Sequence, residues 1–281
     1  MKARVLAYAK VNLFLEVRGL RSDGFHEIRS LVQTIDLADR IEIVPGTGVH
    51  VSCSEKLNGL NIAERAVRAL LREKRAGTGM NIRIEKNIPM GAGLGGGSSD
   101  AAAILATVNK LVPPFIGRSR LSEIASSIGS DVPLFLAGGC VRLSGLGHPE
   151  QQLPPRSESF ALLVPDVHCS TGDIYRAWQP GDAILSEQAL GRNDLCPAAM
   201  RLHPELEAYQ DLIGGIGGLY SGMTGSGSAF FAAFPSRSEA SLACERLTRQ
   251  GTGCRVYCCQ PTSVGFAEPA TAELTEKGKE A

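Results

Sequence analysis

The stretch IPMGAGLGGGSSD, residues 88–100, follows an alternating apolar segment at 80–85 and precedes a segment with helically spaced apolar residues at 101–111. These patterns predict a strand, a glycine-rich turn and a helix in succession. Glycine permits positive φ and close approach of a ligand, so successive N–H groups can point into one concavity. The N-terminus of the helix adds unpaired N–H groups and the positive end of its dipole. The turn is therefore predicted to bind phosphate.

The common nucleotide-binding patterns do not describe this turn. Gly91, Gly93 and Gly96 satisfy GxGxxG, but a dinucleotide fold also needs an acidic residue about 20 positions on, and residues 113–121 contain none. No Gly-Lys-Ser/Thr ends the turn, and the chain contains neither HRD nor DFG. A Walker loop and a protein kinase are thereby excluded. The turn is predicted to be a phosphate cradle of another type, with a tight connection that binds nothing as the alternative.

Composition is that of an ordinary globular protein. The chain has 281 residues, of which 43% are hydrophobic and 21% charged, and this length suggests two domains. A formal net charge of zero argues against nucleic acid or an anionic membrane as a partner. No apolar run reaches the roughly 18 residues of a membrane span. The eight cysteines fit neither a zinc spacing nor CxxC, so we expect reduced thiols in a cytoplasmic protein.

The two halves of the chain differ in the order of their predicted elements. Before the glycine turn we expect a strand from Lys10 to Val17, short strands at 31–35, 40–44 and 49–53, and a helix at 61–73. After Phe160 the order is β-α-β-β-α-β, which is typical of a ferredoxin-like sandwich. The predicted domains are 1–152 and 153–266, followed by a frayed, charged tail at 267–281. The fold class is α+β.

Three motifs together resemble those of the GHMP kinases. They are Ala9-Lys10-Val11-Asn12-Leu13, the turn from Pro89 to Ser99, and Met223-Thr224-Gly225-Ser226-Gly227-Ser228, in the order of that superfamily. The resemblance implies an N-terminal domain like domain 2 of ribosomal protein S5, a C-terminal ferredoxin-like domain, and a kinase that uses ATP with Mg²⁺. It names no metal ligand. We expect a monomer or a weak homodimer.

A narrower resemblance is to the 4-diphosphocytidyl-2-C-methyl-D-erythritol kinases. It covers residues 3 to 266 and depends on AKVNLFLEV, RSDGFHEI, KNIPMGAGLGGGSSDAA and GSDVPLFL. Asp-Gly-aromatic-His, here Asp23-Gly24-Phe25-His26, distinguishes this family from other GHMP kinases. The resemblance implies phosphorylation of the 2-hydroxyl of 4-diphosphocytidyl-2-C-methyl-D-erythritol, in the non-mevalonate route to isoprenoids.

Lys10 and Asp131 are the predicted catalytic pair. Phosphorylation of an alcohol needs an in-line hydroxyl, stabilisation of charge on the transferred group, and a carboxylate that can take the proton. Asp131 alone would be read as a surface cap and Lys10 alone as a solvated strand residue. The resemblance assigns Asp131 as the base and Lys10 as the cation that orients it and neutralises developing charge. An ammonium beside the base would also favour its ionised form.

The resemblance assigns the remaining site residues to the binding of ATP or of the cytidine substrate. His26 and Tyr175 are predicted to sandwich the cytosine, and Phe25 stands where the family commonly has Tyr. The predicted ATP-binding residues are Asn61, Lys86, Pro89, Met90, Gly91, Ala92, Gly93, Leu94, Gly95, Gly96, Gly97, Ser98 and Ser99. The predicted substrate-binding residues are Asn12, Phe25, His26, Tyr175, Gly225, Ser226 and Gly227.

Three other functions stay open on the residues alone. A GHMP kinase with another small alcohol as substrate would not require a cytidine moiety. A nucleotide-binding regulator without catalysis would bind ATP with no turnover. A Rossmann oxidoreductase would bind NAD.

Overall fold

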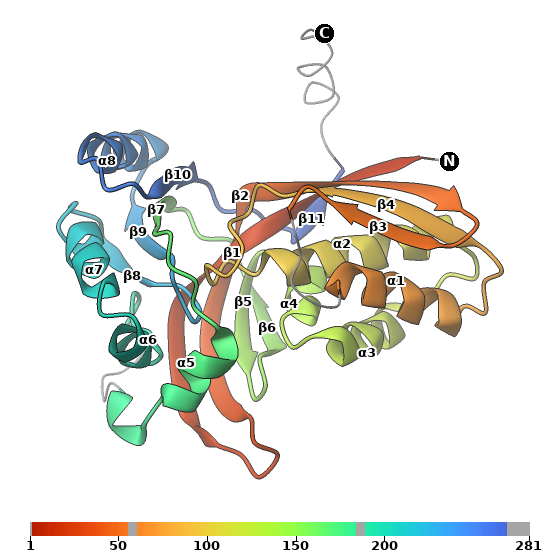
Figure 1. Ribbon diagram of the computed structural model, residues 1–281, viewed down its shortest axis with the longest axis horizontal. Helices are drawn as coiled ribbons and strands as arrows, with labels where there is room; N and C mark the ends of the chain where they lie inside the picture. Colours follow the sequence, from red (N-terminus) through yellow and green to blue (C-terminus); the bar gives the residue numbers. More distant parts are fainter. Residues whose placement is uncertain (1, 56–60, 184–188, 269–281) are drawn as a thin grey trace, which may run out of the picture.

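The computed structural model describes residues 2–55, 61–183 and 189–268, and Figure 1 shows two sheets, each with helices on one face. The first sheet has the strand order β11-β1-β2-β4-β3, with β5 paired to β2 and β6 to β5. Its elements are β1 (Ala3–Leu20), β2 (His26–Gly46), β3 (Val49–Cys53), α1 (Ile62–Glu73), β4 (Gly79–Glu85), α2 (Gly96–Leu111), α3 (Arg118–Ile128), α4 (Val132–Ala137), β5 (Cys140–Ser144), β6 (His148–Leu153) and β11 (Phe266–Ala267).

The second sheet is antiparallel, with the order β10-β7-β9-β8. Its elements are β7 (Ser159–Val164), α5 (Thr171–Ala177), a 3-10 turn (Pro180–Asp182), α6 (Cys196–Leu202), α7 (Leu206–Gly214), β8 (Tyr220–Met223), β9 (Phe230–Phe234), α8 (Arg237–Arg249) and β10 (Arg255–Cys259). The ferredoxin-like order expected after Phe160 is confirmed, because the first and third strands of the motif, β7 and β9, are central and the fourth and second, β10 and β8, are at the edges. Ser236 caps α8 by accepting the N–H of Glu239.

Strand β1 joins the two halves of the molecule. Its centre, residues 9–15, is buried on both faces. Ala9, Val11 and Leu13 lie in an apolar cluster with Phe160 of β7 and Phe231 of β9, between the two sheets. A strand covered on both sides has no solvated face, so polar residues at its centre are buried as well.

Two expectations about the first sheet were wrong. The strands expected at 31–35 and 40–44 are one strand, β2, in which Asp36 and Leu37 form a bulge that shifts the pairing with β1. A bulge adds residues to one strand and interrupts the alternation of its faces. The tail predicted at 267–281 starts at least one residue too early, because Ala267 lies in β11 and pairs with β1. Residues 269–281 lie outside the described residues.

The domain limits at 152 and 266 stay predictions. Leu153 ends β6 and Ser159 begins β7, so the chain passes from the first sheet to the second there. Phe266 returns to the first sheet in β11. Among the described residues, no helix is long and apolar enough to cross a membrane.

Candidate active site

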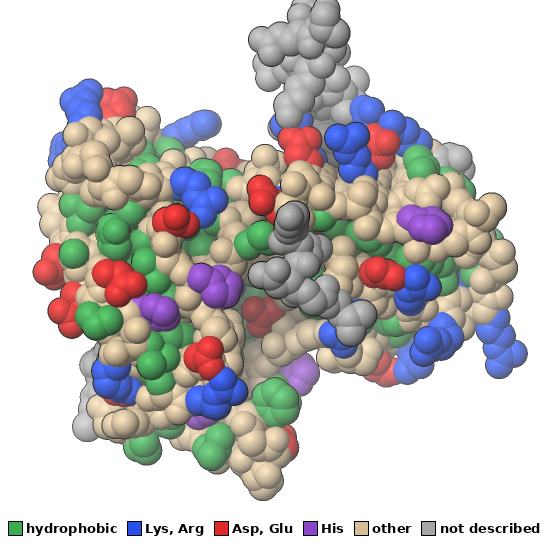
Figure 2. Space-filling view, viewed as in Figure 1, with side chains coloured by type: hydrophobic (Ala, Val, Ile, Leu, Met, Phe, Trp, Pro, Cys, Tyr) green, Lys and Arg blue, Asp and Glu red, His purple; other side chains and the backbone are tan. Residues whose placement is uncertain are grey.

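Two cavities meet at the glycine turn. One, of about 780 Å³, is lined by residues of both halves of the chain, among them Lys10, Asp131 and Gly225. The other, of about 490 Å³, is lined by residues 89–98 and by the start of α1. Gly93 and Gly95 line both. Figure 2 shows the molecule hollowed between its two halves, with basic and acidic side chains interspersed over the visible face.

The glycine turn is held between the two sheets. The N–H of Lys10 donates to the Leu94 carbonyl, and the N–H of Ala229 donates to the Ala92 carbonyl. Gly93 has φ +73°, and a Cβ there would lie 2.1 Å from the Thr224 carbonyl oxygen. No side chain fits at that distance, so this position requires glycine. The turn is a rigid link between the two halves of the molecule.

The N-terminus of α2 faces the smaller cavity. Gly95 has φ +75° and precedes the helix, and the N–H groups of Gly96, Gly97 and Ser98 have no partner within it. Unpaired N–H groups at the positive end of a helix dipole favour phosphate. Ser99 differs, because its hydroxyl donates to the Tyr8 carbonyl at 2.6 Å and its side chain is buried away from the cavity.

Lys10 and Asn12 point to the same side of β1 and are buried. The Lys10 ammonium donates to the Asn12 side-chain oxygen and to the Gly93 carbonyl. The Asn12 amide donates to Ser30 Oγ at 2.9 Å, which fixes its orientation. Burial lowers the pKa of Lys10 to about 8, and the negative charge of Asp131 opposes part of that shift. The strand therefore presents a desolvated ammonium beside the glycine turn.

Asp131 lies between α3 and α4, at the N-cap position of α4, a helix that the sequence patterns did not predict. Its side chain caps nothing in α4 and lines the larger cavity with Lys10. Within the described part of the chain the two residues share a cavity without forming an ion pair, so the electrostatic influence of Asp131 on Lys10 acts across that cavity.

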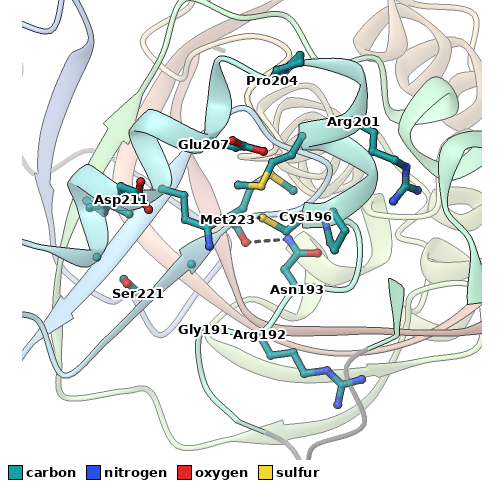
Figure 3. Close-up of a pocket in the computed structure, with 16 residues that line it drawn as sticks. Gly191, Arg192, Asn193, Cys196, Arg201, Pro204, Glu207, Asp211, Ser221 and Met223 are labelled. Carbon is teal, nitrogen blue, oxygen red and sulfur yellow. Dashed lines mark hydrogen bonds between the residues drawn. The ribbon is translucent and has the colours of Figure 1, made fainter. Parts of the chain in front are cut away.

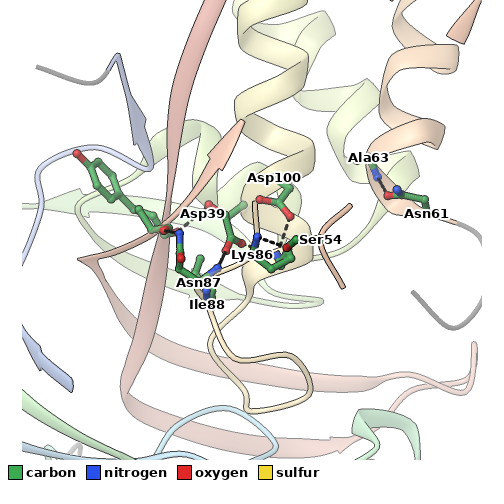
Figure 4. Close-up of polar contacts among 11 residues, drawn as sticks. Asp39, Ser54, Asn61, Ala63, Lys86, Asn87, Ile88 and Asp100 are labelled. Carbon is green, nitrogen blue, oxygen red and sulfur yellow. Dashed lines mark hydrogen bonds and ion pairs between the residues drawn. The ribbon is translucent and has the colours of Figure 1, made fainter. Parts of the chain in front are cut away.

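Lys86 is enclosed by two carboxylates. Its ammonium bonds Asp39 and, at 2.8 Å, Asp100, and Figure 4 shows it between them. Asp39 also accepts the N–H groups of Asn87 and Ile88, at 2.6 and 2.8 Å. Burial raises the pKa of Asp100 to about 8. The cluster ties the entrance of the glycine turn to α2 and lies at the smaller cavity.

Asn61 begins α1 and lines the same cavity. Its side-chain oxygen accepts the Ala63 N–H at 2.9 Å and so caps the helix, as Figure 4 shows. Among the described residues none accepts a hydrogen bond from its amide nitrogen, which remains a donor at the cavity that Asn61 lines.

The aromatic residues lie at the far end of the larger cavity. Phe25, at the tip of the β1–β2 hairpin, is 64% exposed and lines the cavity. The ring centroids of His26 and Tyr175 are 5.3 Å apart and tilted by 35°, and Trp178 meets His26 edge-on at 5.4 Å. A base between two rings needs two contacts of about 3.5 Å each, so His26 and Tyr175 must separate before they can sandwich a cytosine.

The turn after β8 closes the larger cavity from the second sheet. Gly225 and Ser226 line the cavity, whereas Gly227 lies behind them. Thr224 Oγ1 accepts the Asn12 N–H at 2.9 Å, and a Cβ on Gly225 would lie 3.0 Å from the Lys10 ammonium. The turn is therefore packed directly against the residues of β1 that carry the site.

Several residues of the site were missed by the sequence patterns. Asp39 and Thr224 act through hydrogen bonds to segments that are distant in the chain, which no local pattern reveals. His168, exposed after β7, lines the smaller cavity and packs against Gly91, where a Cβ would lie 2.3 Å from its Nδ1. Thr224 does stand inside the third glycine motif, and that position was the one available signal.

Comparison with known families identifies the class of protein. The model for the N-terminal domain of GHMP kinases matches residues 61–139, and the model for their C-terminal domain matches residues 176–253. The chain therefore has both domains of a GHMP kinase, the fold expected from the three motifs.

Individual relatives define the family further. A 4-diphosphocytidyl-2-C-methyl-D-erythritol kinase of Desulfitobacterium hafniense is 37% identical over 85% of this chain and 89% of its own length. Another, of Solibacter usitatus, is 36% identical over 89% and 87%. The chain belongs to the 4-diphosphocytidyl-2-C-methyl-D-erythritol kinase family.

Solved structures agree. A crystal structure of 4-(cytidine 5'-diphospho)-2C-methyl-D-erythritol kinase superposes with a TM-score of 0.79, at 33% identity, over 92% of this chain and 99% of that one. Homoserine kinase from Cytophaga hutchinsonii superposes with a TM-score of 0.74 at 18% identity, over 95% and 96%. At that identity the likeness shows the fold alone.

Proposed function

We propose that this kinase transfers the γ-phosphoryl group of ATP to the 2-hydroxyl of 4-diphosphocytidyl-2-C-methyl-D-erythritol. The observation that carries the proposal is that two cavities of different character share Gly93 and Gly95. Nucleotide in the smaller cavity and alcohol in the larger one would meet at the N-terminus of α2. This is the arrangement that an in-line transfer needs.

Asp131 and Lys10 take separate roles in this proposal. Asp131 accepts the proton of the attacking hydroxyl, because it lines the larger cavity and caps nothing in α4. Lys10 places a positive charge next to Gly93, where negative charge develops on the transferred group. Asn12 holds the Lys10 ammonium in position.

The cytidine end of the substrate would lie against Phe25, His26 and Tyr175. Burial lowers the pKa of His26, which keeps the imidazole neutral, with one nitrogen to donate and one to accept. A neutral ring stacks on a base without the cost of a desolvated charge. Recognition of cytosine by these residues is the part of the proposal that distinguishes this substrate from other small alcohols.

Mg²⁺ would arrive with the triphosphate. Among the described residues no three His, Cys, Asp or Glu side chains gather to hold a metal ion. Mg²⁺ keeps several waters and takes only one or two protein ligands beside phosphate oxygens. Ser98, at the start of α2 and in the smaller cavity, offers a hydroxyl oxygen of this kind. The ion would shield the charge of the transferred phosphoryl group.

A coupled ADP-release assay tests the function. We expect ADP release with the cytidine substrate, and none above background with homoserine or mevalonate. Asp131→Asn should lower kcat by about 10²–10⁴-fold, the range for loss of a general base. Turnover of another alcohol alone would show a different GHMP kinase. ATP binding without turnover, and no effect of Asp131→Ala, would show a non-catalytic regulator.

A further inference from the structure

Asn193 lies outside the larger cavity but contacts the turn that closes it. The residue stands just before α6, and its side chain is 3% exposed. Its amide nitrogen donates to the carbonyl oxygens of Met223 and Gly225, both at 2.8 Å, and its side-chain oxygen accepts the Leu195 N–H at 3.0 Å. Figure 3 shows the amide directed at the Met223 carbonyl. Every strong hydrogen-bonding position of this side chain is aimed at backbone.

The segment that carries Asn193 is fixed to β1. The Leu15 N–H donates to the Arg192 carbonyl at 2.9 Å, and the Asp194 N–H donates back to the Leu15 carbonyl at 3.0 Å. Asp194 Oδ2 accepts the Val17 N–H at 3.0 Å. Asn193 is thus anchored to the strand that bears Lys10, and its position relative to that residue is set by regular backbone pairing.

The peptide between Gly225 and Ser226 lies between Asn193 and the candidate site. Asn193, which lines a separate cavity of about 810 Å³, holds the Gly225 carbonyl, whereas Gly225 and Ser226 themselves line the larger cavity of the candidate site. The peptide is trans, since the cis bonds of the described residues fall elsewhere. In a planar trans peptide the carbonyl and the N–H point in opposite directions. With its carbonyl on Asn193, this peptide directs the Ser226 N–H toward the candidate site.

The Ser226 N–H has no acceptor among the residues that the structure describes. Its side chain is engaged elsewhere, with the hydroxyl 2.9 Å from that of Thr171. An unpaired N–H that faces a cavity is costly unless a ligand or water satisfies it. Because Gly225 lies beside the Lys10 ammonium, the acceptor that fits here is an anionic oxygen.

We propose that Asn193 is a positioning residue that orients the Gly225–Ser226 peptide so that its N–H donates to an oxygen of the phosphoryl group during transfer. This rests on the proposed function and deepens it. Asn193 itself touches no reacting atom. Without the Asn193 amide, the Gly225 carbonyl loses the hydrogen bond that directs it away from the candidate site. The peptide can then rotate so that its carbonyl oxygen, rather than its N–H, faces the phosphate.

The test replaces the donor and keeps the shape. Asn193→Asp retains the acceptor for Leu195 but places a carboxylate oxygen against the Met223 and Gly225 carbonyls. The matched control is Asn109→Asp: Asn109 is also buried, its amide donates to the Ile116 carbonyl at 2.8 Å, and it lines none of the cavities described above. Both substitutions remove hydrogen bonds from a side-chain amide to backbone carbonyls, Asn193→Asp next to the candidate site and Asn109→Asp away from it.

We expect Asn193→Asp to lower kcat about 100-fold, as loss of one oxyanion donor does, with both KM values within about threefold of wild type. An effect on kcat alone means that the contact acts in the transition state. Asn109→Asp should lose comparable thermal stability and keep its kcat. Asn193→Ala, in which water can replace the amide, should lose less, about tenfold. If Asn193→Asp does not fold, Asn193→Ala takes its place in the comparison with Asn109→Asp.

A crystal structure of Asn193→Asp separates this proposal from the proposed function. It should show the Gly225–Ser226 peptide rotated. If wild type fails to phosphorylate the cytidine substrate, the proposed function is wrong, and the peptide orientation alone decides the role of Asn193. An unrotated peptide, or a kcat equal to that of Asn109→Asp, overturns the inference.

Discussion

Two lysines at the glycine turn are buried in different ways. Lys10 is held by a side-chain amide oxygen and a carbonyl, and burial lowers its pKa to about 8. Lys86 is held by the carboxylates of Asp39 and Asp100, whose charges outweigh burial and raise its pKa. A buried cation that forms no ion pair has charge to offer a ligand, whereas one paired with a buried carboxylate has already been neutralised. We infer that Lys10 serves the reaction and Lys86 serves the fold.

Lys10→Met should produce the largest effect on activity. Methionine has a similar length and needs no hydrogen-bond partner, so we expect kcat to fall about 10³-fold while the free energy of unfolding stays within about 2 kcal/mol of wild type. ADP release and urea denaturation measure the two quantities. Lys110→Met, at an exposed position of α2, is the control and should change neither. A Lys10→Met enzyme with wild-type turnover would remove Lys10 from the mechanism.

Lys86→Met should produce the largest effect on stability. The substitution leaves the buried Asp39 carboxylate without its cation, and removal of one partner of a buried ion pair costs about 3–5 kcal/mol. We expect that loss in urea denaturation at pH 7. Equal losses of stability in Lys86→Met and Lys10→Met would show that the carboxylates do not distinguish the two lysines.

The pH dependence of turnover tests the charge of Lys10. Because burial lowers its pKa to about 8, kcat/KM should fall tenfold per pH unit above that value. Lys10→Arg stays charged, so this limb should move to higher pH even if the variant is slower. Since the unfolded chain binds the proton up to about pH 10.5, stability should rise with pH between about 8 and 10.5. A limb that is unchanged in Lys10→Arg belongs to another group.

Asp100→Asn should produce the smallest effect. Burial raises the pKa of Asp100 to about 8, so the folded protein holds a proton that the unfolded chain releases above about pH 4, and stability falls as pH rises between these values. We expect the substitution to flatten that slope and to cost less than about 1 kcal/mol at pH 6, because a neutral amide replaces a neutral carboxyl.

The matched variant Asp39→Asn should cost more than Asp100→Asn. Asp39 accepts two backbone N–H groups besides the Lys86 ammonium, and hydrogen bonds to a charged group contribute about 1.5–3 kcal/mol. Urea denaturation of both variants across pH 4–8 measures the difference. A larger loss in Asp100→Asn than in Asp39→Asn would contradict this assignment of the proton.

Local patterns predicted the elements whose signals lie close together in the chain. The glycine turn, α2 and the capped helix α8 each combine a periodic segment with the correct end residues. Strand β2 was divided in two because the bulge at Asp36 and Leu37 breaks its alternation. Helix α4, six residues long and apolar, is too short to show a helical period. Asp131 was therefore identified by resemblance and not by its place in a predicted element.

The sequence by itself determined the glycine turn and the helix that follows it, because they are contiguous and need no distant partner to expose N–H groups. The motifs at Lys10 and Gly225 also identified the family, which the comparisons confirm. Only the tertiary structure decided which lysine keeps its charge available. That difference depends on Asp39, 47 residues from Lys86, and on the placement of Lys10, whose ammonium contacts a side-chain amide and a backbone carbonyl and forms no ion pair among the described residues. Charge and burial belong to the assembled environment, and no segment of the chain carries that environment alone.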